Sequence, residues 1–99
     1  MEIHFKDKNT KEVIEGIKER LGGRKLGDLL EINALGDDIK VTISKMGTST
    51  LEFSHRKNQE GHVWELSKEK LAFTHKAFKG EIVSKLTDII QSMGGTVTG

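Results

Sequence analysis

The sequence predicts an α+β fold: an antiparallel meander of four to five strands, a short N-terminal strand, and two amphipathic helices. Five short apolar runs with a period of two lie between residues 28 and 73. Apolar residues recur at helical spacing on both sides of this block. Hairpin-length connections favour antiparallel neighbours. Both helices need an apolar surface and the meander has one apolar face, so we expect a two-layer sandwich in the order β-α-β-β-β-β-(β)-α.

The N-terminal region predicts a strand followed by a helix. Ile3 and Phe5 alternate with polar residues, as in a short strand. Asn9 and Glu12 have the spacing of a helix N-cap and its reciprocal partner. Four apolar residues then share one helical face: Val13, Ile14, Ile17 and Leu21. These signals predict a helix over 10–21.

The central block alternates between apolar and polar residues and is divided by turns. Gly, Asp, Asn and Ser residues fall between the runs, as in hairpin turns. The predicted strands cover the runs 30–34, 39–43, 51–55, 62–66 and 69–73. The last run is the weakest, and we expect it to be an edge strand.

The C-terminal region contains the clearest amphipathic helix. One apolar stripe joins Phe78, Ile82, Leu86, Ile89, Ile90 and Met93. The pattern predicts a helix that begins at Thr74 or His75 and ends at Gly94. We therefore expect one domain over residues 1–95 and a flexible tail over 96–99.

Composition excludes several classes of protein. The chain has no Cys, which removes disulfides, thiolate metal sites and cysteine nucleophiles. Its formal net charge is +1, which is no mark of a nucleic-acid binder. The sequence has no apolar run long enough for a membrane span and no secretion signal. We expect a cytoplasmic protein without a membrane partner and without a cofactor, since no cofactor motif is present.

Basic residues gather at the end of the sheet where the first helix finishes, which we name the helix-exit end. The alternation of strand directions predicts this cluster: Arg20, Arg24, Lys25, Lys45, Lys68 and Lys70. Several Lys and Arg side chains together could hold a phosphate backbone or another polyanion. Bases near helix C-termini also complement the helix dipole, so a purely structural role is the alternative.

The opposite end, which we name the far end, is expected to hold a mixed group of His, Asp and Lys. His55 and His62 flank one loop and share a strand phase, and Asp37 and Asp38 tip the neighbouring hairpin. Such a set could bind a metal ion or perform acid–base chemistry. Turn aspartates that accept backbone hydrogen bonds and half-buried histidines are the alternative, and we expect no metal site.

Two further lysines, Lys76 and Lys79, lie in the first turns of the predicted second helix, and we place them, together with His75, at the far end. Together with the helix N-terminal amides they could receive an anion. A nearby carboxylate such as Glu81 could equally compensate them.

The sequence favours a binding module over an enzyme. A complete core pattern is present without convergent reactive residues or a phosphate-binding loop. We expect a small non-catalytic domain that contacts a protein partner or a second copy of itself through the polar sheet face or a free sheet edge. Nucleic-acid or polyanion binding at the basic cluster is the second hypothesis, and metal-dependent chemistry at the far end is the third.

Overall fold

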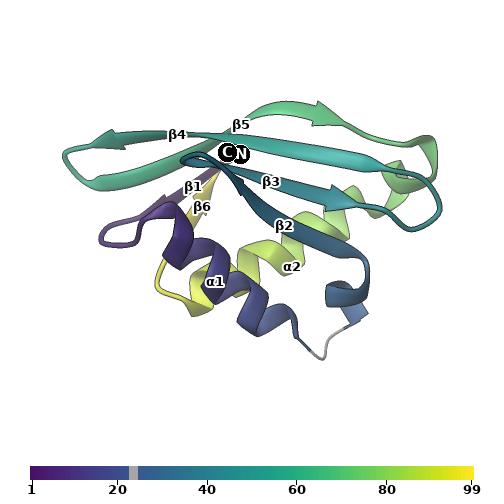
Figure 1. Cartoon of the computed structure of the whole chain (residues 1–99), viewed down its shortest axis with the longest axis horizontal. Coiled ribbons are helices and arrows are strands. Elements are labelled where there is room, and N and C mark those ends of the chain that lie inside the picture. The colour runs from purple at the N-terminus through teal and green to yellow at the C-terminus, as the bar shows by residue number, and fades with distance from the viewer. Residues whose placement is uncertain (23–24) are drawn as a thin grey trace.

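The computed structural model describes residues 1–22 and 25–99 and contains one six-stranded antiparallel sheet and two α-helices (Figure 1). Two short 3-10 helices, η1 and η2, precede β2 and α2. The elements in chain order are β1 Glu2–Phe5, α1 Thr10–Leu21, η1 Lys25–Asp28, β2 Leu30–Leu35, β3 Asp38–Ile43, β4 Ser49–Asn58, β5 Gly61–Lys70, η2 Phe73–Phe78, α2 Lys79–Ser92 and β6 Thr96–Thr98.

The sheet order is β2-β3-β4-β5-β1-β6. Strands β2 to β5 form the predicted meander, in its four-stranded version, and both helices cover the same face of the sheet (Figure 1). The α+β fold with its helical layer and sheet layer is therefore confirmed. β1 extends the sheet beyond β5, with Phe5 opposite His62 and Glu2 opposite Glu65.

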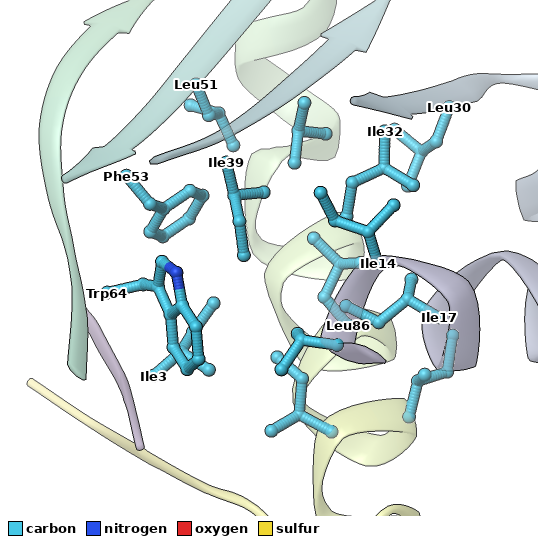
Figure 2. Packing of buried hydrophobic residues seen from close by; sticks show 14 of the residues in the cluster. Ile3, Ile14, Ile17, Leu30, Ile32, Ile39, Leu51, Phe53, Trp64 and Leu86 are labelled. Atoms are coloured by element: carbon cyan, nitrogen blue, oxygen red, sulfur yellow. The ribbon is translucent and has the colours of Figure 1, made fainter. Parts of the chain in front are cut away.

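The apolar faces predicted from the sequence are buried in the structure. Asn9 caps α1 as expected: its side chain accepts from the Glu12 amide at 2.9 Å, and Glu12 accepts from the Asn9 amide at 3.2 Å. Apolar side chains from α1 and α2 meet those of the sheet in one cluster (Figure 2). Trp64 is the largest fully buried side chain, and Phe5 meets its ring edge-on with centroids 6.1 Å apart. This packing places the core between the sheet and the two helices.

The edge strand predicted over 69–73 is wrong. β5 continues through the expected turn at Ser67 to Lys70, and Phe73 begins η2 instead of ending a strand. The ladder between β4 and β5 is irregular here, because Phe53 pairs with Leu66 whereas Glu52 pairs with Lys68. A bulge of this kind adds one residue and shifts the side-chain phase, which imitates a turn in the sequence.

The longer β5 changes the end of the sheet at which the chain emerges. Lys70 lies opposite Thr50, near the start of β4, so η2 follows at the helix-exit end. The Thr74 hydroxyl donates to the Met46 carbonyl at 2.5 Å and fastens η2 to the β3–β4 turn. Gly47 in that turn has φ +120°, and a Cβ there would lie 3.1 Å from both Ala72 and Thr74. His75, Lys76 and Lys79 therefore do not lie at the far end, where the sequence placed them.

Most of the segment 96–99, which was expected to be a flexible tail, is a strand in the structure. Residues Thr96–Thr98 form β6, which pairs with β1 in the register Glu2–Thr98, Ile3–Val97 and His4–Thr96. Val97 packs half-buried against the core. Three residues are too short a run for periodicity to reveal, and the strand depends on a partner at the other end of the sequence.

The two helices contact each other near the end of α2. A Cβ on Gly16 of α1 would lie 2.3 Å from the Met93 methyl group, so the missing side chain makes room for Met93. Arg20 donates to Ser92 Oγ at 3.1 Å in the same region. Across the parts of the chain that the structure describes, no helix is long and apolar enough to cross a membrane.

Candidate functional site

The two histidines of the far end, His55 and His62, lie together and pack against each other and against Trp64. His55 Nε2 and His62 Nδ1 are 2.9 Å apart, and their rings stack with centroids 5.1 Å apart. Both rings also lie against the buried indole of Trp64, at 5.2 and 5.8 Å between centroids. The two side chains thus cover one end of the core and hydrogen-bond each other.

The aspartates of the far end contact backbone and core groups. Asp38 Oδ1 accepts from the His55 amide at 2.8 Å, and the Asp37 carbonyl accepts from Trp64 Nε1 and Thr10 Oγ1 at 3.1 and 2.6 Å. Neither contact joins an aspartate to an imidazole ring. Within residues 1–22 and 25–99, no group of three or more His, Cys, Asp or Glu side chains could hold a metal ion. This end can orient a hairpin, and its contacts supply no metal-binding set.

The basic cluster predicted at the helix-exit end is divided. Arg20 donates to Ser92 Oγ and to the Gly16 carbonyl, which ties it to the C-terminal end of α2 and away from the other bases. Arg24 lies outside the described residues, as does the side chain of Lys25. Lys45 follows β3 and is exposed.

Strand β5 and η2 supply the remaining bases. Lys68 lies opposite Glu52 and Lys70 opposite Thr50, both exposed. Because η2 lies at the helix-exit end, Lys76 lies there too. Its Nζ is 6.0 Å from the centroid of the Phe73 ring, and Phe73 is 88% exposed. Lys79 forms an ion pair with Glu69, so its carboxylate partner is Glu69 and not the Glu81 named as a candidate from sequence.

A hollow of about 790 Å³ lies at the helix-exit end between α2 and the β3–β4 turn, and we name it the helix-exit hollow. Its lining residues are Leu29, Ile43, Lys45, Met46, Thr74, His75, Phe78, Glu81, Ile82 and Lys85. Met46 is 78% exposed and Phe78 is 54% exposed, although Phe78 was expected on the buried stripe of the helix. The sequence did not predict this site. Its only signal was large apolar residues in a turn and at a helix start.

A buried histidine holds one wall of the hollow. His75 is 5% exposed, and its Nε2 must donate to the Lys45 carbonyl at 2.5 Å because a carbonyl only accepts. Nδ1 hydrogen-bonds Ser49 Oγ at 2.5 Å, and Ser49 Oγ accepts from the Ala72 amide at 2.7 Å. These bonds fix η2 against the first residue of β4.

The second open feature is the free edge of β2. β2 is the terminal strand of the sheet, pairs with β3 over six residues without a bulge, and contains no Lys, Arg or Pro. Two hollows of about 400 Å³ each lie along β2 beside α1 and meet at Lys18. Apolar residues from both elements line them: Ile14, Leu21, Leu30, Ile32 and Ala34.

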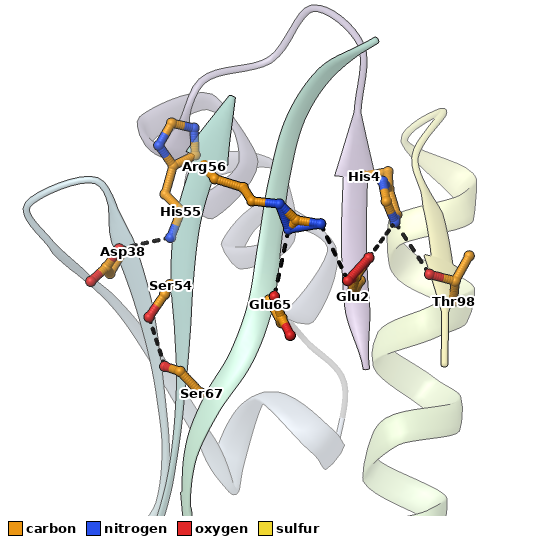
Figure 3. Close-up of polar contacts among 9 residues, drawn as sticks. All are labelled: Glu2, His4, Asp38, Ser54, His55, Arg56, Glu65, Ser67 and Thr98. Atoms are coloured by element: carbon orange, nitrogen blue, oxygen red, sulfur yellow. Dashed lines mark hydrogen bonds and ion pairs between the residues drawn. The ribbon is translucent and has the colours of Figure 1, made fainter. Parts of the chain in front are cut away.

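The outer face of the sheet is polar, and its groups bind one another (Figure 3). Arg56 reaches Glu2 and Glu65 at 3.4 and 3.5 Å, and the Ser54 hydroxyl donates to Ser67 Oγ at 2.7 Å. Val63 lies between Arg56 and His4 in the ladder and is buried on this face, as expected where long side chains cover an apolar one. Exposed ion pairs of this kind add little stability.

Comparison with protein-family models, with curated proteins and with solved structures finds no significant match to this chain.

Proposed function

We propose that the protein is a small non-catalytic binding module that acts through contact with another protein, and that the partner docks an extended segment on the edge of β2. The observation that carries this proposal is the regular six-residue edge, in which Glu31 is the one charged residue, flanked by two hollows. Exposed strand edges present unpaired amides and carbonyls that another strand can satisfy. The sheet's other edge, β6, has only three residues.

The hollows beside α1 indicate which segment would fit. An added strand points every second side chain towards α1. There the apolar residues of the hollows lie beside polar and charged ones, among them Glu15, Asp28 and Glu31. Lys18 lies where the two hollows meet, and none of the ion pairs found among the described residues involves it. We expect a partner segment with alternating apolar residues and an acidic residue opposite Lys18.

Selection from a displayed random-peptide library tests this proposal. Peptides enriched on the wild-type protein should alternate apolar and polar residues, carry Asp or Glu, and slow amide hydrogen exchange in β2. Leu35→Lys and Lys18→Glu should abolish their binding, because one places a lysine on the edge, as protected edge strands do, and the other reverses the charge between the hollows. Ser44→Lys is the matched control, because Ser44 is exposed and directly follows β3, the strand that pairs with β2. This variant should bind the selected peptides as the wild-type protein does.

Light scattering distinguishes a partner from self-association. A dimer that Leu35→Lys dissociates would identify a second copy of the chain as the bound protein. If the protein is monomeric and enriches no peptide that the Leu35→Lys protein fails to bind, docking on β2 is wrong.

A second candidate is binding of single-stranded nucleic acid at the helix-exit end, favoured by the exposed Phe73 beside Lys76. Lys45 and Lys70 lie at the same end, so a base could stack on the ring while lysines contact phosphates. Fluorescence anisotropy with a labelled oligonucleotide should show affinity that falls with salt and that weakens about fivefold or more in Phe73→Ser. No binding at low salt would remove this candidate.

A further inference from the structure

The helix-exit hollow has the size and lining of a small-molecule site. Its volume of about 790 Å³ lies within the range of about 300–1,000 Å³ that is typical of ligand pockets. Leu29, Ile43 and Ile82 form apolar walls, and Met46 and Phe78 add apolar surface that is still exposed to solvent. Burying such surface against an apolar ligand is favourable in proportion to its area.

The polar groups within the hollow are already engaged. Both ring nitrogens of His75 are hydrogen-bonded to Ser49 and to the Lys45 carbonyl, and the Thr74 hydroxyl donates to the Met46 carbonyl. No buried side-chain nitrogen or oxygen in the described chain lacks a partner. An extended peptide would bring amides and carbonyls that these walls leave unsatisfied, at a cost in free energy. An alkyl chain brings none.

The charged residues that line the hollow favour an anion. Lys45 and Lys85 contribute two ammonium groups from opposite walls, the β3–β4 turn and α2, whereas Glu81 contributes one carboxylate. All three side chains are exposed, so a charged head group could meet them without leaving water. The lining is therefore apolar inside and cationic on balance at its exposed residues.

We propose that the helix-exit hollow binds a single-chain amphiphile, with the alkyl chain against Ile43, Phe78 and Ile82 and an anionic head group near Lys45 and Lys85. The lining of the hollow contains no residue of β2, so amphiphile binding in the hollow and partner docking on the β2 edge are tested independently of each other.

Titration of the ¹⁵N-labelled protein with alkyl carboxylates tests the proposal by amide chemical shifts. Octanoate, decanoate and dodecanoate are used below their micelle-forming concentrations. We expect shifts at residues 43–47 and 74–85, and a Kd that falls about fourfold for each added methylene group until the hollow is full. Decyltrimethylammonium, with the same chain and the opposite charge, should bind at least about fivefold more weakly than decanoate.

Variants at exposed positions locate the binding without disturbing the core. Met46→Ser and Phe78→Ser should each weaken decanoate binding at least about fivefold, because each removes apolar contact area from the hollow. Phe73→Ser and Leu35→Ser are matched controls, since both side chains are exposed but do not line the hollow. Both control proteins should bind decanoate with the wild-type Kd.

The head-group contact has its own pair of variants. Lys45→Gln should weaken decanoate binding, whereas Glu81→Gln should tighten it by removing a like charge. Absence of decanoate binding, a Kd independent of chain length, or equal affinity for the ammonium amphiphile would overturn the proposal. Wild-type affinity in both Met46→Ser and Phe78→Ser would also overturn it, because the chain would then lie elsewhere.

Discussion

The two ends of the sheet use aromatic and apolar side chains in opposite ways. At the far end, the indole of Trp64 is fully buried beneath His55 and His62, and its N–H donates to Thr10 and to the Asp37 carbonyl. At the helix-exit end, Met46, Phe73 and Phe78 remain exposed. The comparison teaches that aromatic rings stabilise the fold at the far end, where Leu35 is an exposed apolar exception, whereas Phe73 and Phe78 are left available for contact at the helix-exit end.

Trp64→Ala is the strongest way to break this comparison. The substitution empties the largest buried position and removes the contacts with Phe5, His55 and His62. We expect a loss of about 3–5 kcal/mol in the free energy of unfolding, measured by urea denaturation. A loss below that of an ordinary surface substitution would mean that the far end does not stabilise the fold.

Ser49→Ala tests the buried polar connection between β4 and η2 at the helix-exit end. It removes the hydroxyl that His75 Nδ1 and the Ala72 amide share. We expect a loss of about 1–3 kcal/mol, because two buried groups lose their partner. Hydrogen exchange should show faster opening of η2 than of β5, and equal acceleration in both elements would contradict a local role.

Thr10→Val probes the corresponding connection at the far end. The hydroxyl donates to the Asp37 carbonyl and accepts from Trp64 Nε1, and the indole N–H keeps a second acceptor in that same carbonyl. The expected loss is about 1 kcal/mol, smaller than for Ser49→Ala because the Trp64 donor remains satisfied. Thermal unfolding of the two variants side by side measures the difference.

The exposed apolar residues should have the smallest effects on stability. Met46→Ser and Phe73→Ser are expected to change the free energy of unfolding by no more than about 0.5 kcal/mol. Urea denaturation of both variants checks this. A loss comparable to that of Thr10→Val would show that these side chains support the fold, and it would weaken the case for contact surfaces at this end.

Most of the fold could be predicted from local patterns because its elements are periodic. The capping pair Asn9–Glu12, the alternation in β2 to β4 and the stripe of α2 each report a buried face directly. The bulge near Ser67 and the strand β6 could not be predicted, since both depend on which residues pair across the sheet.

The helix-exit hollow shows how one such error propagates. The sequence pattern predicted that β5 ends at Leu66 and that a further strand follows. This prediction placed the segment of η2, with His75, Lys76 and Lys79, at the wrong end of the sheet. The hollow exists because η2 packs on the β3–β4 turn, which no periodicity reveals. The His55–His62 pair was correctly expected to be close, since strand phase and a shared loop determine it.

The position of β1 between β5 and β6 has a consequence for the order of folding. The meander strands pair with their sequence neighbours, whereas β1 needs partners from residues 62–65 and 96–98. Long loops close at a greater entropic cost and form contacts later, so we expect φ-values near zero at Val97 and higher values at Val41. Equal φ-values at both positions would contradict this order. Until β1 and β6 are in place, β5 is itself an open edge, so a slowly folding chain has an additional site for aggregation that the finished sheet covers.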